Sequence, residues 1–213
     1  MNNEILKRIL SSLILIPIAL FFIIKGSYFF IFFILICFLI SSYEWHFMSK
    51  NKKYYLPGFI FIIFSFYTFY FFRIEGEYRV FLLIFIVCIA TDIGGYIFGK
   101  IFKGPKLTKI SPNKTYAGMF GSFLLSIIFA SIYIKNIPIF HLLQLYEHII
   151  LMIIVLLISI ASQVGDITIS FFKRKSKIKN TGKIIPGHGG LLDRIDGMIF
   201  AFPFMFLLTE IIF

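Results

Sequence analysis

The sequence predicts an all-α integral membrane protein, a polytopic helical bundle with about seven transmembrane helices. Of its 213 residues, 59% are hydrophobic, and the mean hydropathy is +0.93. In soluble domains only about half of the residues are apolar. Because one helical crossing of a hydrocarbon core ~30 Å thick takes about 20 apolar residues, the chain has room for about seven crossings and no separate soluble domain.

Apolar runs separated by polar breaks place the helices along the chain. The candidate helices cover residues 9–24, 28–48, 56–72, 79–98, 117–134, 148–170 and 191–212. The first follows Lys7 and Arg8 but lacks a small-residue cleavage site, and further spans follow it, so we interpret it as a retained helix and not a signal peptide. The last is the least regular, because Asp193, Arg194 and Asp196 occupy its first turns.

The distribution of lysine and arginine predicts the orientation. Most of the 21 basic residues lie at the amino terminus and in every second break, whereas the other breaks hold only Lys25, Arg73, Arg79 and Lys135. Short loops rich in Lys and Arg stay cytoplasmic. The pattern therefore predicts a cytoplasmic amino terminus, an outside carboxyl terminus and seven crossings of the cytoplasmic (inner) membrane.

The chain has four aspartates, and each lies where an apolar segment meets a lysine-rich stretch. The predicted topology puts all of them at the cytoplasmic face: Asp92, Asp166, Asp193 and Asp196. A carboxylate costs roughly 2.5 to 3.5 kcal/mol at the centre of a membrane helix and usually marks an ion or substrate site. Asp193 and Asp196, three residues apart, would share one face of a helical turn and could hold a divalent cation. Pairing with Lys or Arg is the alternative interpretation.

Two polar loops contain the other candidate residues. In the first, Gly95 and Gly99 have a spacing typical of close helix packing, and Lys114 and Thr115 precede an apolar run whose positive helix terminus could hold a phosphate. The second contains residues 186–196, PGHGGLLDRID. Its glycines would allow a ligand to approach closely, and His188 and Arg194 could donate to phosphate oxygens. A hydrogen bond within a turn is the alternative for His188.

Residues 170–196 resemble the signature of the phosphatidate cytidylyltransferases, also called CDP-diacylglycerol synthases. The matching elements are Ser170, Lys173, Arg174, Lys179, the Pro-Gly-His-Gly-Gly block at 186–190, and Asp193, Arg194 and Asp196. Upstream, similar elements are Asp92, Gly95, Tyr96, Gly99, Lys100 and SPNKT at 111–115, and Glu44 and Trp45 resemble an early Glu-Trp pair of the family. Asn180 stands where the family has Asp, and we interpret this position as lying outside the first metal shell.

This resemblance implies a reaction and a division of roles. The substrates would be CTP and phosphatidate, giving CDP-diacylglycerol and pyrophosphate at the cytoplasmic face, with amino-terminal helices at about 1–75 and a catalytic part at about 79–213 of a single transmembrane domain. Mg²⁺ would be held by Asp166, Asp193 and Asp196, with Asp92 completing the catalytic set and K⁺ as a second cation. The expected substrate-binding residues are Ser111, Lys114, Thr115, Lys173, Arg174, His188, Gly189, Gly190 and Arg194.

Other function classes fit less well. A transporter would place its carboxylates near the midplane on broken helices, often in repeated halves, and no repeat is present. Enzymes that transfer a phospho-alcohol from CDP-diacylglycerol carry an Asp-Gly, Ala-Arg and spaced-Asp pattern that this chain lacks. The net charge of +11 comes without any nucleic-acid-binding module, so we expect lipid bilayer contact and no nucleic acid. A homodimer is a possible assembly of this chain.

Overall fold

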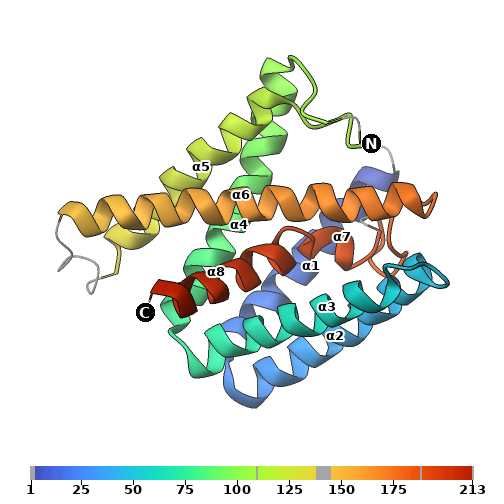
Figure 1. The fold of residues 1–213 in the computed structure, drawn as a ribbon, viewed down its shortest axis with the longest axis horizontal. Coiled ribbons are helices and arrows are strands. Elements are labelled where there is room, and N and C mark those ends of the chain that lie inside the picture. Colours follow the sequence, from blue (N-terminus) through green and yellow to red (C-terminus); the bar gives the residue numbers. More distant parts are fainter. Residues whose placement is uncertain (1–2, 109, 138–144, 188, 213) are drawn as a thin grey trace. The chain divides into compact units, whose positions relative to one another are not determined.

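The computed structural model describes residues 3–108, 110–137, 145–187 and 189–212. The chain is helical almost throughout (Figure 1). Its elements are α1 (Asn3–Lys25), α2 (Ser27–Ser49), α3 (Tyr55–Tyr70), the π-helical η1 (Phe71–Glu75), α4 (Tyr78–Phe102), α5 (Tyr116–Lys135), α6 (Leu145–Lys175), α7 (Leu192–Ile195) and α8 (Met198–Ile212). Within the described ranges, β-structure is limited to two isolated bridges. The all-α prediction is confirmed.

Among the residues that the structure describes, five helices are long and apolar enough to cross a membrane. They cover Ser27–Ser49, Tyr55–Glu75, Tyr78–Phe102, Tyr116–Lys135 and Glu147–Lys175, and two shorter apolar helices cover Leu13–Lys25 and Met198–Ile211. Each predicted helix therefore has an apolar counterpart at its expected place, and the chain is a polytopic membrane protein.

The helix predicted at 191–212 is broken in the structure. The short α7 ends at Ile195 and α8 begins at Met198, with Asp196 and Gly197 between them. The first turn is held to the preceding loop, because Asp193 accepts hydrogen bonds from the N–H groups of Thr181 and Gly190. The remaining 15 residues of α8 rise about 22 Å at 1.5 Å per residue, which is less than the ~30 Å hydrocarbon core.

The chain forms two compact units. Unit 1 comprises residues 1–78 and 172–196, and unit 2 comprises residues 79–171 and 197–213. In unit 1, α2 and α3 lie side by side (Figure 1). The indole N–H of Trp45 donates to the carbonyl oxygen of Tyr55 at 3.0 Å, which ties the end of α2 to the start of α3. The segment that precedes α7 therefore belongs with the amino-terminal helices, although it is far from them in sequence.

Arg73 of η1 joins the end of α1 to the end of the segment that follows α3. Its Nε donates to the carbonyl oxygen of Ile23 at 2.7 Å, and a terminal nitrogen donates to that of Ile24 at 3.1 Å. Its guanidinium carbon lies 4.2 Å from the ring centroid of Tyr78. A cation that bonds the last carbonyls of a helix satisfies groups that have no partner within that helix. Arg73 therefore caps α1 from η1.

In unit 2, small residues and hydroxyl groups join the helices. A Cβ atom on Gly94 would lie 2.4 Å from the carbonyl oxygen of Gly121, so α4 and α5 touch backbone to backbone there. The hydroxyl of Ser122 donates to the carbonyl oxygen of Thr91 at 2.7 Å, and the Thr91 hydroxyl lies 2.8 Å from that of Ser159 on α6. Membrane helices associate through such contacts because lipid leaves little hydrophobic force between them.

The predicted packing role of Gly95 and Gly99 is confirmed by the same pair of helices. A Cβ on Gly95 would lie 3.0 Å from the hydroxyl of Ser122 on α5, and one on Gly99 would lie 3.3 Å from the hydroxyl of Thr115. Both glycines thus allow α4 to approach the start of α5.

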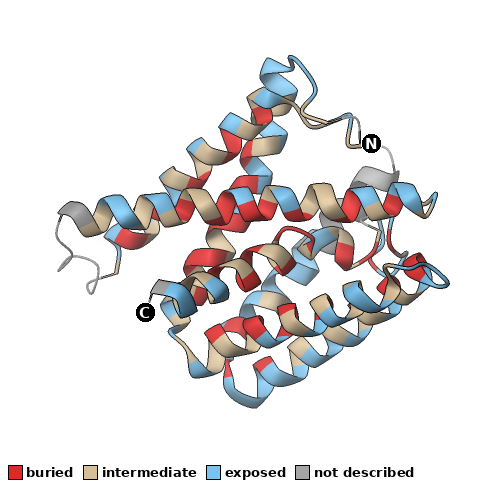
Figure 2. Cartoon of the chain, in the orientation of Figure 1, coloured by how far each residue is buried: buried red, intermediate tan, exposed pale blue. Residues whose placement is uncertain are grey.

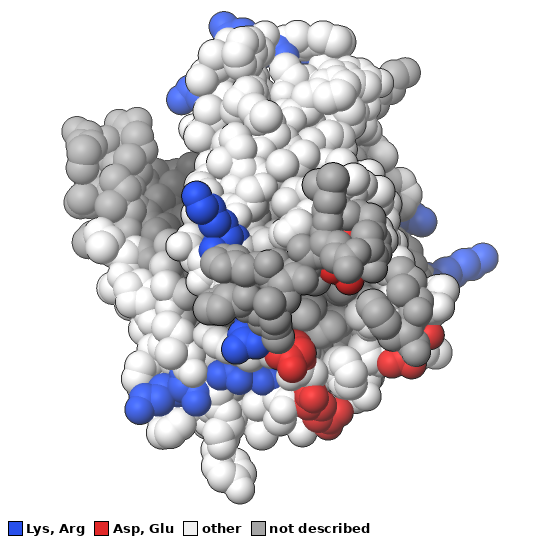
Figure 3. Space-filling view, turned by 90° about the vertical axis from the view of Figure 1, so that its left-hand side faces the viewer, with Lys and Arg blue, Asp and Glu red and all other residues white. Residues whose placement is uncertain are grey.

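The surface is largely apolar. Exposed residues follow α2 and α3 along their length (Figure 2), and they include Leu39 and Ile60, each 58% exposed. On the face drawn in Figure 3, several charged side chains lie close together in the lower part of the view, and most of the other described surface there belongs to other residues. Exposed leucine, isoleucine and phenylalanine over whole helices are expected where lipid replaces water as the solvent.

Candidate active site

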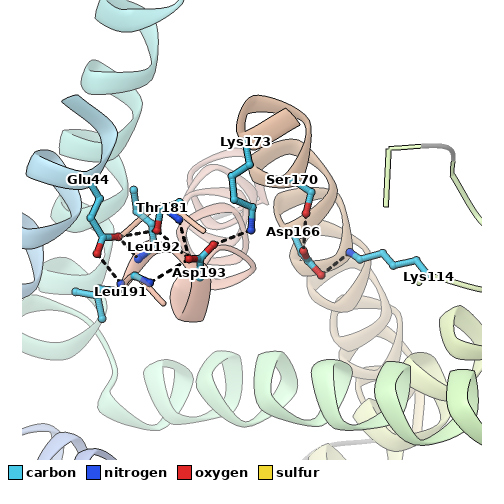
Figure 4. A network of polar contacts seen from close by, with 10 residues as sticks. Glu44, Lys114, Asp166, Ser170, Lys173, Thr181, Leu191, Leu192 and Asp193 are labelled. Carbon is cyan, nitrogen blue, oxygen red and sulfur yellow. Dashed lines mark hydrogen bonds and ion pairs between the residues drawn. The ribbon is translucent and has the colours of Figure 1, made fainter. Parts of the chain in front are cut away.

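Asp193 is the centre of the polar network in unit 1. Its Oδ1 lies 2.7 Å from the Nζ of Lys173. Its Oδ2 accepts hydrogen bonds from the N–H of Thr181 at 2.8 Å and of Gly190 at 3.1 Å, and the Thr181 hydroxyl lies at 3.1 Å (Figure 4). A carboxylate offers about four lone-pair positions. The Oδ1 of Asp193 therefore retains room for one further partner beside the ammonium group.

The Lys173–Asp193 pair is removed from solvent. The side chains are 11% and 5% exposed, and Lys173 lies in the last turn of α6. Burying two charges is costly unless they pair closely and their other lone pairs are bonded, and the donors on Oδ2 meet that condition. Pairing with a cation, the alternative interpretation of the aspartates, is thus what this structure shows for Asp193.

Glu44 of α2 holds the same loop from the other side. Its Oε1 accepts from the N–H of Leu191 at 2.8 Å, and its Oε2 accepts from the N–H of Leu192 at 2.9 Å and from the Thr181 hydroxyl at 2.8 Å (Figure 4). Glu44 is 1% exposed. The sequence alone predicts no role for Glu44, which with Trp45 only resembles an early Glu-Trp pair of the family. The available signal was an acidic residue inside an apolar helix.

Glycines let residues 181–190 close around these two carboxylates; we call this segment the glycine loop. The N–H and C=O groups of Ile185 and Gly189 bond each other at 2.9 and 3.1 Å, and Gly189 has φ +91°, which favours glycine. A Cβ on Gly182 would lie 2.6 Å from the Oε1 of Glu44, and one on Gly190 would lie 2.5 Å from its Oε2. A Cβ at either position would therefore have to displace the Glu44 carboxylate and, at Gly190, also the Thr181 hydroxyl.

A second network lies in unit 2 around Asp166 of α6. Its Oδ2 pairs with the Nζ of Lys114 at 2.5 Å, and its Oδ1 accepts from the hydroxyl of Ser170 at 3.3 Å (Figure 4). The Lys114 and Asp166 side chains are 21% and 31% exposed. This pair is therefore more accessible to water than the Lys173–Asp193 pair.

Lys114 is carried on a structured turn at the start of α5. Its N–H donates to the carbonyl oxygen of Ser111 at 3.0 Å, and its carbonyl oxygen accepts from the N–H of Leu107 at 2.8 Å. Thr115 is the N-cap of α5, because its hydroxyl oxygen accepts from the N–H of Gly118 at 3.1 Å. The predicted residues Ser111, Lys114 and Thr115 thus share one ordered turn.

The remaining predicted residues take several positions. Asp196 is 7% exposed and directly follows α7, whereas Asp92 is an exposed residue of α4. Arg174 and Arg194 are exposed, and His188 lies outside the described residues. Across the described ranges, no three His, Cys, Asp or Glu side chains gather as a metal-binding group. Asp166, Asp193 and Asp196 supply carboxylate oxygens, the donor type that Mg²⁺ prefers.

These features define a polytopic α-helical membrane protein with buried and half-buried carboxylate–lysine pairs at helix ends. Its residues 6–80 and 73–212 match the model of a family described as the cytidylyltransferase family. The chain belongs to this family, and it is an enzyme of the nucleotidyltransferase class.

Similar proteins from several bacteria carry one name, phosphatidate cytidylyltransferase. The Rickettsia felis protein is 36% identical over 214 residues, which cover 98% of this chain and 93% of that protein. The Rickettsia typhi protein is 35% identical over 96% of this chain and 92% of its own length. The Bacillus subtilis protein is 37% identical over 134 residues, 60% of this chain and 47% of that protein.

Proposed function

We propose that this chain is a phosphatidate cytidylyltransferase, which makes CDP-diacylglycerol and pyrophosphate from CTP and phosphatidate. The observation that carries the proposal is the buried Lys173–Asp193 pair, which the glycine loop of this chain holds in place. The chain is a member of the cytidylyltransferase family. Relatives that carry this activity in their name match it over nearly the whole chain.

The chemistry asks mainly for alignment and charge neutralisation. An oxygen of the phosphatidate phosphate forms a bond to the α-phosphorus of CTP, and the bond from that phosphorus to the oxygen bridging to the β-phosphate breaks, so pyrophosphate leaves. The attacking phosphate is already ionised at neutral pH, and no strong general base is needed. Phosphoryl transfers of this type are accelerated by positioning and by fixed positive charge.

Basic residues at the ends of helices suit this task. Lys114 is carried on the turn before α5, and Lys173 lies in the last turn of α6, each beside a carboxylate that fixes its position. In the proposal these two lysines, with the exposed Arg174 and Arg194, neutralise the phosphates of the substrates. The turn residues Ser111 and Thr115 contact the nucleotide or the lipid head. Gly189 and Gly190 allow the backbone of the glycine loop to approach the bound substrate closely.

The aspartates are proposed to hold Mg²⁺. Asp193 would contribute the free position on Oδ1, Asp196 follows it by three residues, and each oxygen of Asp166 has one partner described above. Asp92 is proposed to complete the set, with K⁺ as a second cation. When bound, the divalent ion would supply charge neutralisation to the triphosphate and to the departing pyrophosphate.

We also propose that the reaction takes place at the cytoplasmic face of the inner membrane. The distribution of lysine and arginine supports this orientation, because basic loops are retained on the cytoplasmic side. CTP is a cytosolic anion, and the phosphate of phosphatidate lies at the membrane surface, so a site at the cytoplasmic helix ends would meet both substrates.

The test is a transfer assay with the purified full-length protein in mixed micelles of detergent and phosphatidate. With CTP labelled at the α-phosphate and Mg²⁺ present, label should enter the lipid with release of one pyrophosphate per lipid formed. Asp193→Ala should abolish transfer while the protein still elutes as a folded species, and Glu75→Ala, at an exposed acid, should retain it. Absence of CTP-dependent labelling by folded protein, or near-normal turnover by Asp193→Ala, would contradict the proposal.

A further inference from the structure

We infer that Glu44 is a positioning residue of this enzyme: its buried carboxylate fixes the backbone that carries Asp193. The inference rests on the proposed function for its kinetic part only. Glu44 lies on α2, and its bond to Thr181 joins residues 137 positions apart in the chain. Figure 4 shows the Glu44 carboxylate directed at Thr181, Leu191 and Leu192, next to Asp193.

The partners of Glu44 belong to the backbone of the loop and to one hydroxyl. Its carboxylate accepts the N–H groups of Leu191 and Leu192 and the O–H of Thr181, all at 2.8 to 2.9 Å. A buried charge is tolerated only when its hydrogen-bonding positions are filled. Because moving the loop away would leave a charged group without donors, the buried carboxylate resists displacement of residues 191 and 192.

Glu44 and Asp193 accept hydrogen bonds from neighbouring N–H groups of the same short stretch of backbone. Asp193 accepts the N–H of Gly190, and Glu44 accepts the next two N–H groups along the chain. The Thr181 hydroxyl is within bonding distance of both carboxylates, at 2.8 Å from Glu44 and 3.1 Å from Asp193. A change at Glu44 therefore reaches Asp193 through three consecutive peptide groups and through Thr181.

Burial assigns Glu44 to positioning and not to contact with the substrates. It is 1% exposed, so neither a nucleotide nor a lipid phosphate reaches its oxygens. The loop also fits closely against it, because a Cβ on Gly182 would stand 2.6 Å from Oε1. The close contact between the loop and α2 thus depends both on the missing side chain at Gly182 and on the carboxylate of Glu44.

Glu44→Gln tests this inference with little change of shape. One carboxylate oxygen becomes an NH₂ group, which cannot accept from a peptide N–H, so one or more of the three bonds is lost. Groups that orient functional residues typically lower activity about 10- to 100-fold when removed. We expect kcat per folded molecule to fall by about that factor, with a smaller change in the KM for CTP.

Hydrogen–deuterium exchange supplies a readout that does not depend on turnover. In Glu44→Gln, the amides of Gly190, Leu191 and Leu192 should exchange faster than in the unsubstituted protein, while peptides of α4 and α5 are unchanged. Glu77→Gln removes the same charge from an exposed site and should alter neither kcat nor exchange.

Gly182→Ala gives an independent test, because its methyl group would push against the Glu44 carboxylate from the loop side. Gly182→Ala should reproduce both the lower kcat and the faster exchange. If Glu44→Gln does not fold, the same two measurements on Gly182→Ala decide the test. A folded variant with kcat within about twofold of the unsubstituted value, or with unchanged exchange at residues 190–192, would overturn the inference. If the unsubstituted protein transfers no label, the proposed function fails, while exchange still decides whether Glu44 holds the loop.

Discussion

Replacing Lys173 by methionine should destabilise unit 1 by removing the partner of a buried charge. The Lys173 and Asp193 side chains are 11% and 5% exposed and lie 2.7 Å apart. Breaking a buried pair by removing one partner costs about 3 to 5 kcal/mol, because the other charge is left without compensation. Asp193 keeps the donors on its Oδ2, so we expect a loss near the lower limit, about 3 kcal/mol.

A double-mutant cycle separates the pair from the packing of the lysine stem. Methionine retains an unbranched apolar chain, so Lys173→Met mainly removes the ammonium group. In the Asp193→Asn background, the same substitution no longer strands a charge and should cost far less. We expect a coupling free energy on the order of 2 kcal/mol, within the usual range for residues in contact.

The single tryptophan of the chain provides a local probe for this measurement. Trp45 is 2% exposed, and its ring centroid lies 5.3 Å from that of Phe172, the neighbour of Lys173. Unfolding in mixed micelles with a denaturing detergent can be followed by its fluorescence, with Lys183→Met as the exposed control. A change for Lys173→Met within about 0.5 kcal/mol, or an equal cost in both backgrounds, would refute the reasoning.

Two further substitutions test contacts that hold each unit together. Gly94→Ala places a methyl group 2.4 Å from the carbonyl oxygen of Gly121, so α4 and α5 must separate. We expect about 1 to 3 kcal/mol of destabilisation in the same detergent titration, and an unchanged midpoint would show that the helices are not in backbone contact. Arg73→Met removes the cap of α1 and the contact with Tyr78; we expect a loss of about 1 to 3 kcal/mol, whereas unfolding identical to the unsubstituted protein would argue against this cap.

The helices could be predicted from sequence because lipid imposes a simple rule on them. A run of about 20 apolar residues has few alternatives to a helix in a bilayer, and α2 to α6 follow the predicted ranges. The break at Asp196 and Gly197 did not follow from hydropathy, since α8 is apolar and continues the same run. It depends on bonds that Asp193 makes with a loop, and such bonds leave no periodic signal.

The candidate site could be predicted only in part. The resemblance pointed to Lys173, Gly190 and Asp193, and the structure brings these three together. It did not indicate Thr181 or the role of Glu44, because Glu44 is 137 to 148 positions away in the chain from its partners, which are mostly backbone N–H groups. Every residue except proline has the same backbone N–H group. The sequence of the loop therefore does not indicate which side chain will accept hydrogen bonds from its backbone.

The length of α6 has a consequence for how a lipid substrate is met. Its 31 residues rise about 46 Å, some 15 Å more than the hydrocarbon core of a bilayer. An upright helix of that length must protrude from the hydrocarbon core, and its last turn carries the exposed Arg174 and Lys175 next to the buried Lys173. The protruding end of α6 would place Arg174 and Lys175 among the phosphates of the surrounding leaflet. A phospholipid could react there without being drawn out of the membrane.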